Sequence, residues 1–230
     1  IRVRAAALNF KDVLNTLGMY PGDAGPLGGE CAGEIAALGE GVTGLEVGQR
    51  VLAIAPGSFR SYVVAQAPLV APLPPGMSYA EGAAVPIAFV TAAYTLRHLG
   101  KLQAGERVLI HAAAGGVGLA AVQIAQMVGA EVIATAGSES KRAYLRSLGV
   151  QDVFDSRSLS FADGVREATG GRGVDVALNS LAGPFIPATL ALLAPGGRFL
   201  EIGKSGLLTP EQAAALGEGR QYHTVFLGDQ

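Results

Sequence analysis

The stretch His111-Ala-Ala-Ala-Gly115-Gly116-Val117-Gly118-Leu119-Ala120 decides the fold of this 230-residue chain. It begins at the end of a predicted strand, Arg107-Val-Leu-Ile-His111, and runs into a helical pattern from Gly116 to Val128. Read as Ala113-x-Gly115-x-x-Gly118, it is a dinucleotide-binding fingerprint with alanine at the first glycine position. Small residues let a backbone approach a pyrophosphate, and a helix start offers free N–H groups and a positive dipole end. The alternative is a tight strand-to-helix turn that needs small residues only for packing.

Around this turn, apolar strands alternate with helical segments, which is typical of a parallel α/β sheet covered on both faces. We expect strands at 107–111, 131–135, 174–178 and 198–202, and helices at 116–128 and 140–148. Glycine turns, Gly170-Gly171 and Gly196-Gly197, precede the last two strands. The first third instead reads as short strands joined by turns, with β-rich pieces at 50–54 and 61–65, and Ser78 with Glu81 forms a capping box. The change of pattern predicts two domains with a boundary near residue 88.

Composition narrows the function classes. Half of the residues are hydrophobic and 16% are charged, which excludes an intrinsically disordered chain. The net charge of −2, without runs of Lys or Arg, argues against partners such as nucleic acid or an anionic membrane. The single cysteine, Cys31, cannot form an internal disulfide or a multi-cysteine metal cluster, so we expect a reducing compartment, the cytoplasm. The uncharged run 108–130 is long enough for a membrane span, but its central glycines favour a strand, a turn and a helix.

The end of the second strand bears on which nucleotide would bind. An NAD site usually has an acidic side chain there, whereas an NADP site accepts a 2′-phosphate with cations and hydroxyls. Ser138, Lys141 and Arg157 suit a phosphate and favour NADPH. Glu139 keeps NAD open, and Lys141 with Arg142 would also fit a solvated first helical turn.

Several motifs together resemble one family. They are the segments 8–14 (Leu-Asn-Phe-Lys-Asp-Val-Leu), 17–22 (Leu-Gly-Met-Tyr-Pro-Gly), 28–30 (Gly-Gly-Glu), 111–118, 169–175 (Thr-Gly-Gly-Arg-Gly-Val-Asp), 178–181 (Leu-Asn-Ser-Leu) and 199–204 (Phe-Leu-Glu-Ile-Gly-Lys). The chain is similar to the enoyl reductase domains of modular polyketide synthases and of the related animal fatty acid synthase. These are zinc-independent members of the medium-chain dehydrogenase/reductase superfamily. Quinone oxidoreductases share the fold and the glycine turn, but the 178–181 and 199–204 segments favour the synthase reductases.

The resemblance implies an α/β architecture of two parts. A GroES-like, β-rich substrate domain would cover 1–88, and a Rossmann domain with a doubly wound parallel sheet would bind NADPH over 89–230. Because the family's domains are longer, we expect the first to be incomplete at its N-terminus and the second at its C-terminus. Zinc enzymes of the superfamily carry Gly-His-Glu where this chain has Gly28-Gly29-Glu30, so we expect no metal.

The implied reaction reduces the α,β double bond of an enoyl thioester by hydride transfer to the β-carbon and protonation of the α-carbon. The implied partners are an acyl carrier protein with a phosphopantetheine-tethered substrate and the neighbouring ketoreductase and dehydratase domains. Lys204 and Tyr20 are the candidate acids, although a surface lysine and a wall tyrosine are the simpler interpretations. The cofactor-binding candidates are Asn9, Thr91, Ala114, Gly115, Gly116, Val117, Gly118, Ser138, Lys141, Arg157, Asn179, Ser180, Leu181 and Gly203.

Some of these residues have structural alternatives. Thr91 would also serve in helix packing, and Asn179 as a strand-end cap. We expect Asp12 to cap a helix and His111 to end a core strand with its hydrogen bonds satisfied. The family often pairs the lysine with a later aspartate, where this chain has Phe226, with Asp229 three positions on. Two rival functions stay open: a free-standing NADPH quinone reductase, and a non-catalytic structural domain of a megasynthase.

Overall fold

The computed structural model describes residues 1–225 and divides into two compact units. The first is Ile1–Val90, and the second begins at Thr91. The boundary expected from the sequence, residue 88, lies close to this division. Helix α3 (Pro86–Ala93) contains the division.

The first unit contains a four-stranded antiparallel sheet in the order β1-β2-β3-β4. Its strands are β1 (Arg2–Ala6), β2 (Glu30–Glu34), β3 (Arg50–Ile54) and β4 (Val70–Pro72), and its short helices are α1 (Phe10–Thr16), η1 (Ala67–Leu69) and α2 (Tyr79–Ala83). Small apolar side chains, among them Cys31, Ala53 and Ala55, form its core. The β-rich piece at 61–65 is no strand of this sheet, because only Tyr62 forms a bridge, to Arg2.

The predicted capping box starts α2. The backbone N–H of Ser78 donates to Oε2 of Glu81 (2.8 Å), and the N–H of Glu81 donates to Oγ of Ser78 (3.2 Å). These reciprocal bonds satisfy two backbone donors that the first helical turn leaves without intrahelical partners.

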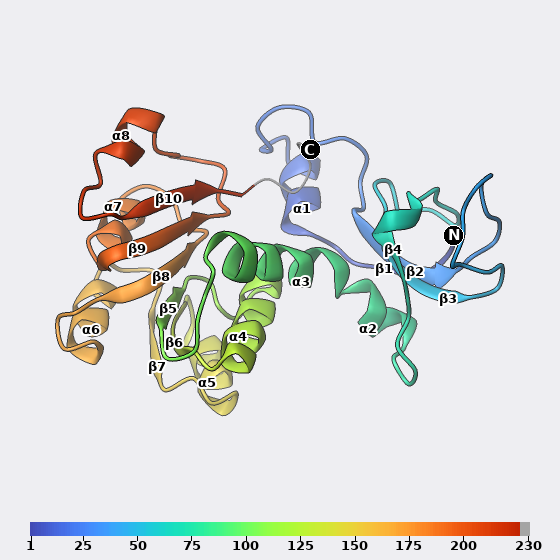
Figure 1. The fold of residues 1–230 in the computed structure, drawn as a ribbon. Helices are drawn as coiled ribbons and strands as arrows, with labels where there is room; N and C mark the ends of the chain where they lie inside the picture. Colours follow the sequence, from blue (N-terminus) through green and yellow to red (C-terminus); the bar gives the residue numbers. More distant parts are fainter. Residues whose placement is uncertain (226–230) are drawn as a thin grey trace. The chain divides into compact units, whose positions relative to one another are not determined.

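The second unit is a six-stranded parallel sheet in the order β10-β9-β8-β5-β6-β7, with helices on both faces (Figure 1). Its strands are β5 (Arg107–Ile110), β6 (Glu131–Ala136), β7 (Asp152–Asp155), β8 (Val174–Asn179), β9 (Leu193–Glu201) and β10 (Gln221–Thr224). Its helical segments are η2 (Tyr94–Leu99), α4 (Gly116–Val128), α5 (Glu139–Ser147), α6 (Phe161–Ala168), α7 (Phe185–Leu190) and α8 (Pro210–Ala214). Helices α4 and α5 lie on one face, and α6 and α7 on the other. This doubly wound arrangement confirms the predicted α/β class.

Most of the predicted elements of this unit are present, and α4 has the predicted bounds. Strand β9 is an exception: it begins at Leu193, so Gly196 and Gly197 lie inside it and not before it. The reason is that Val174 pairs with Leu193, and the ladder then shifts register before Val176 pairs with Arg198. The uncharged run 108–130 is divided between β5 and α4, and no helix within residues 1–225 is long and apolar enough to cross a membrane.

The strand order reverses between β5 and β8. The chain runs from β5 to β6 and β7 on one side, and then from β8 to β9 and β10 on the other. In open α/β sheets, ligands bind outside the carboxyl ends of the strands at such a switch point. The edge of the sheet after Ile110 and Asn179 is therefore where a nucleotide is expected.

His111 closes the core at this edge, as predicted. It is 3% exposed; Nδ1 lies 2.9 Å from Oγ1 of Thr135, and Nε2 lies 2.8 Å from Oγ1 of Thr189. The Thr189 hydroxyl already donates to the carbonyl of Phe185 (2.8 Å), so it accepts from Nε2, and Nδ1 accepts from Thr135. These bonds select the neutral imidazole, and burial lowers the pKa of His111 to about 3.

We expect the stability of the second unit to fall as the pH drops below about 6.5, the pKa of an unperturbed histidine. Between that pH and about 3, His111 takes up a proton only in the unfolded state. The free energy of unfolding should therefore lose about 1.4 kcal/mol per pH unit from this group. The pH dependence of the free energy of unfolding can be measured by urea unfolding of the wild type and of His111→Gln between pH 4.5 and 8. Equal slopes for the two proteins would contradict the assignment.

Candidate functional site

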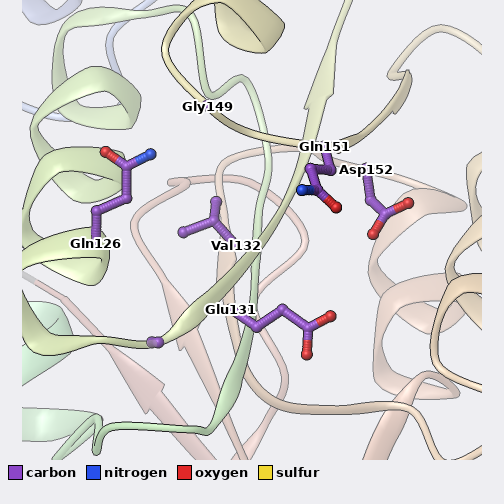
Figure 2. Close-up of a pocket in the computed structure, with 7 residues that line it drawn as sticks. Gln126, Glu131, Val132, Gly149, Gln151 and Asp152 are labelled. Carbon is purple, nitrogen blue, oxygen red and sulfur yellow. The ribbon is translucent and has the colours of Figure 1, made fainter.

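The carboxyl edge of the parallel sheet carries most of the predicted site residues. The hollow in Figure 2 is a different place: it encloses about 260 Å³ and is lined by residues such as Glu131 and Asp152. These two residues begin β6 and β7, so the hollow lies at the amino ends of the strands. Ligands of doubly wound sheets bind at the opposite edge, so the candidate site lies at the carboxyl ends of the strands.

The glycine turn joins β5 to α4 with very little space between them. A Cβ atom on Gly118 would lie 2.5 Å from the carbonyl oxygen of Ala112 and 2.6 Å from Cα of Ala113, so a side chain does not fit. Gly116 has open space around its Cα. Gly115 is the N-cap of α4, and its N–H donates to the carbonyl of Ala112 (2.9 Å).

The start of α4 has the features of an anion site. The N–H groups of Gly116, Val117 and Gly118 lie in its first turn, which lacks intrahelical acceptors. Ala114 immediately precedes the N-cap Gly115 and is half-buried. A 13-residue helix also directs the positive end of its dipole here, so the turn fits a pyrophosphate.

Cations and hydroxyls gather at the end of β6. Nε of Arg157 donates to the carbonyl of Gly137 (2.7 Å), and a Cβ on Gly137 would come within 3.0 Å of that nitrogen. Ser138 is the N-cap of α5, and its Oγ accepts from the N–H of Lys141 (3.4 Å). The structure thus brings Arg157 to the strand end that carries Ser138 and Lys141, although twenty residues separate Arg157 from Gly137.

Glu139, the acidic residue that left NAD as an alternative cofactor, is paired with two arginines. Nε of Arg142 lies 3.0 Å and Nη1 of Arg146 lies 2.8 Å from its carboxylate oxygens. Hydrogen bonds from Arg146 and Arg142 lower the pKa of Glu139. Arg142 is half-buried and also donates to the carbonyl of Ala136 (3.0 Å), so it is more than a solvated residue of the first turn. The local negative charge is therefore offset where a second phosphate would lie.

The ends of β8 and β9 form one bonded unit. Nδ2 of Asn179 donates to Oε2 of Glu201 (2.6 Å) and to the carbonyl of Leu181 (2.8 Å), while its Oδ1 accepts from the N–H of Leu181 (3.2 Å). The N–H of Gly203 donates to Oε1 of Glu201 (2.7 Å). Asn179 thus acts as the strand-end cap that was its structural alternative, and both of its amide hydrogens are used within the protein.

Ser180 lies between the two bonded residues of this strand end. Its Oγ is shielded from solvent and has no hydrogen-bond partner among the described residues. A buried hydroxyl without a partner costs roughly 1–3 kcal/mol, so native proteins rarely keep one without a reason. A ligand atom with hydrogen-bonding capacity would provide the partner, and the site fits a dinucleotide on this ground.

Lys204 follows Gly203 and is half-buried. Its Nζ donates to the carbonyl of Val225 (3.4 Å), just after strand β10. Phe226 and Asp229, the positions considered for a partner aspartate, lie outside the described residues. Thr91, the first residue of the second unit, is buried, and its carbonyl accepts from Oγ1 of Thr95 (2.8 Å).

The remaining candidates belong to the first unit. Nδ2 of Asn9, the N-cap of α1, donates to Oε1 of Glu30 (2.9 Å). Asp12 caps the same helix as predicted, because its carboxylate accepts from the N–H groups of Asn9 (2.9 Å) and Gly28 (2.8 Å). Tyr20 is half-buried, with Nζ of Lys11 5.4 Å from its ring centroid.

The segment from Gly28 to Cys31 does not offer donors that would hold zinc. Gly29 has no side chain, both carboxylate oxygens of Glu30 accept protein hydrogen bonds, and Cys31 lies in the core of the first sheet. Within residues 1–225, no three His, Cys, Asp or Glu side chains gather in a way that could hold a metal ion.

Two buried, hydrogen-bonded carboxylates escaped the sequence-based prediction. Glu30 and Glu201 are 2% and 1% exposed, and each carboxylate binds a carboxamide and a backbone N–H. Burial raises the pKa of both. The signal was present, since Glu201 interrupts the apolar run Phe199-Leu-Glu-Ile202, where a buried strand rarely carries a charge.

Comparisons with known proteins agree with this geometry. Residues 1–75 match the alcohol dehydrogenase GroES-like domain family, and residues 116–227 match the zinc-binding dehydrogenase family. The chain is 50% identical, over 99% of its length, to a phenolphthiocerol/phthiocerol polyketide synthase of Mycobacterium tuberculosis. It spans 11% of that much longer protein.

Solved structures give the same result. The CurK enoyl reductase is 46% identical with a TM-score of 0.92, and the match covers 98% of this chain and 71% of that one. The mycobacterial protein Rv1454c, solved in complex with NADPH, is 31% identical with a TM-score of 0.88, covering 98% and 72% of the two chains. The folds predicted from the resemblance, GroES-like and Rossmann-type, are confirmed by these matches. The chain belongs to the enoyl reductase domains of polyketide synthases.

Proposed function

We propose that this chain catalyses the NADPH-dependent reduction of the α,β double bond of an enoyl thioester presented by an acyl carrier protein. The proposal rests on the family and on one observation, the buried hydroxyl of Ser180 without a partner, at the sheet edge that carries the glycine turn and Lys204. The neighbouring ketoreductase and dehydratase domains of a synthase would supply such a substrate.

In this proposal the dinucleotide lies along the carboxyl edge of the second sheet. The first turn of α4, from Gly116 to Gly118, binds the pyrophosphate through backbone N–H groups. The hydroxyl of Ser180 binds the nicotinamide half, with Thr91, Leu181 and Gly203 as further contacts.

The phosphate-binding end distinguishes NADPH from NADH. Arg157, Ser138 and Lys141 would bind the 2′-phosphate, and the pairing of Glu139 with two arginines offsets the negative charge that would repel it. The relative Rv1454c was solved with NADPH, which supports the same cofactor here.

The chemistry needs a hydride and a proton. When bound, NADPH supplies the hydride to the β-carbon of the enoyl group. Lys204 would deliver the proton to the α-carbon, since its ammonium follows β9 at the carboxyl edge of the sheet. Tyr20 of the first unit is the second candidate acid, and Asn9 is a candidate contact to cofactor or substrate.

Turnover of crotonyl pantetheine with NADPH, followed by absorbance at saturating cofactor, tests the function. We expect Lys204→Ala to slow the reaction by roughly 100-fold, the usual contribution of a general acid. Lys101→Gly is the matched control, because it removes an exposed lysine whose φ of 44° suits glycine. Reduction of quinones but not of the thioester would favour the rival quinone reductase. Turnover of the Lys204→Ala protein at the wild-type rate would remove Lys204 from the mechanism.

Ser180→Ala separates binding from folding. We expect NADPH to bind about tenfold more weakly, since a ligand hydrogen bond is lost, while the melting temperature does not fall, since no internal bond breaks. The contrast is Ser58→Ala, which removes a buried bond from Oγ to the carbonyl of Glu30 (2.9 Å) and should cost about 1 kcal/mol. Calorimetry gives the melting temperature, and fluorescence titration gives the dissociation constant for NADPH. An unchanged dissociation constant for Ser180→Ala would contradict the assignment.

Arg157→Ala should change cofactor preference. We expect NADPH affinity to fall about tenfold with little change for NADH, because only NADPH carries the 2′-phosphate. Arg166→Ala is the control, as this exposed arginine pairs only with Asp163 of its own helix among the described residues. Parallel titrations with both cofactors measure the ratio, and an equal loss for NADPH and NADH would refute a phosphate contact.

A further inference from the structure

A buried carboxylate joins two strand ends at the carboxyl edge of the parallel sheet. Glu201, the last residue of β9, is 1% exposed and accepts from Nδ2 of Asn179 (2.6 Å) and from the N–H of Gly203 (2.7 Å). It therefore joins the end of β8 to the turn that follows β9.

The partner Asn179 has no amide hydrogen left for a ligand. One bonds to Glu201, the other bonds to the carbonyl of Leu181 (2.8 Å), and Oδ1 accepts from the N–H of Leu181 (3.2 Å). The backbone on both sides of Ser180 is thereby held, which sets the position of the Cα that carries its unpartnered hydroxyl.

The second partner fixes the turn before Lys204. A Cβ on Gly203 would lie 2.7 Å from Oε1 of Glu201, so glycine is needed for the carboxylate to reach this N–H. The N–H of Ile202 donates to the carbonyl of Asn179 (2.9 Å), which adds a backbone link between the same two strand ends.

The chemistry of the contact requires a group that only accepts. Two N–H donors converge on the two oxygens of Glu201, and an ionised carboxylate accepts at both. A glutamine of the same shape would place its own NH2 against one of these donors and leave it without an acceptor.

The first unit repeats this arrangement. Glu30, which is 2% exposed, accepts from Nδ2 of Asn9 (2.9 Å) and from the N–H of Ile87 (2.7 Å). In both units a buried carboxylate thus accepts hydrogen bonds from an asparagine side chain and from a backbone N–H. The repeated arrangement indicates that such a carboxylate serves to orient the asparagine and the backbone segment.

We propose that Glu201 is a positioning residue of the nucleotide site, which acts through Asn179 and Gly203 to hold Ser180 and the turn of Lys204 in their binding arrangement. The inference rests on the proposed function, because the ligand it serves is the dinucleotide assigned there.

The test uses Glu201→Gln in the 230-residue chain. We expect the dissociation constant for NADPH, measured by fluorescence titration, to rise about tenfold, since one donor at the strand ends loses its acceptor. When both proteins are free of NADPH, the backbone amides of Gly203 and Leu181 should exchange hydrogen faster in the variant than in the wild type. Glu106→Gln is the matched control: it makes the same chemical change in a partly buried pair with Arg198, and Glu106 precedes β5 at the amino end of the sheet.

A double variant guards against simple destabilisation. In Asn179→Asp with Glu201→Gln, the glutamine NH2 donates to the new carboxylate, and its oxygen accepts from the N–H of Gly203. This carboxylate cannot replace the bond from Asn179 to the carbonyl of Leu181, so recovery is expected to be incomplete. We expect this double variant to recover at least part of the NADPH affinity lost in Glu201→Gln. A wild-type dissociation constant in Glu201→Gln, with a fall in melting temperature like that of Glu106→Gln, would overturn the inference, as would a double variant that binds no better than the single one.

The outcome for Glu201 is separable from the outcome for the proposed function. A wild-type chain that binds NADPH but leaves crotonyl pantetheine unreduced would overturn the proposed function alone, and the titrations would still decide the inference on Glu201. A chain that reduces the thioester while Glu201→Gln binds NADPH normally would overturn only the inference.

Discussion

The absence of a side chain at Gly118 is the constraint on which the second unit depends. Because nothing projects from this position, α4 can begin against the carbonyl of Ala112, directly beyond β5. The N-terminal end of the helix then lies at the switch point between β5 and β8, where the strand order reverses. A larger residue would push the helix away from the sheet and move its dipole and its free N–H groups away from the edge that the other site residues share.

Much of this unit could be predicted from the residues because its signals are local. The run from Arg107 to Val128 contains an apolar strand, a turn of small residues and an amphipathic helix in immediate succession, and the structure keeps these bounds for α4. The short strands β7 and β10 were not predicted, since Asp152 and Asp155 end the first and polar residues fill the second. The start of β9 was placed too late because a glycine pair usually marks a turn, whereas here the ladder tolerates it through a register shift.

The site was less accessible to sequence because its contacts join distant residues. The glycine turn and the N-cap Ser138 are local features, so both could be recognised. The bond from Asn179 to Glu201 spans 22 residues and exists only because β8 and β9 are neighbours in the sheet. The resemblance gave Asn179 a contact role, while the structure shows its amide hydrogens bound within the protein. Family motifs therefore pointed to the ends of β8 and β9 without indicating that the Asn179 side chain is bonded within the protein.

Arg157 is partly ordered by a hydrogen bond within the protein before any ligand binds. A free arginine side chain has about 2 kcal/mol of rotamer entropy, which is lost when it is ordered around an anion. Here Nε is already bonded to the carbonyl of Gly137, so part of that entropy is lost during folding. The guanidinium is thereby anchored at Gly137, which immediately precedes Ser138, the N-cap of α5. Discrimination between two cofactors that differ by one phosphate group would then draw on a cation whose position is set by the backbone of a glycine.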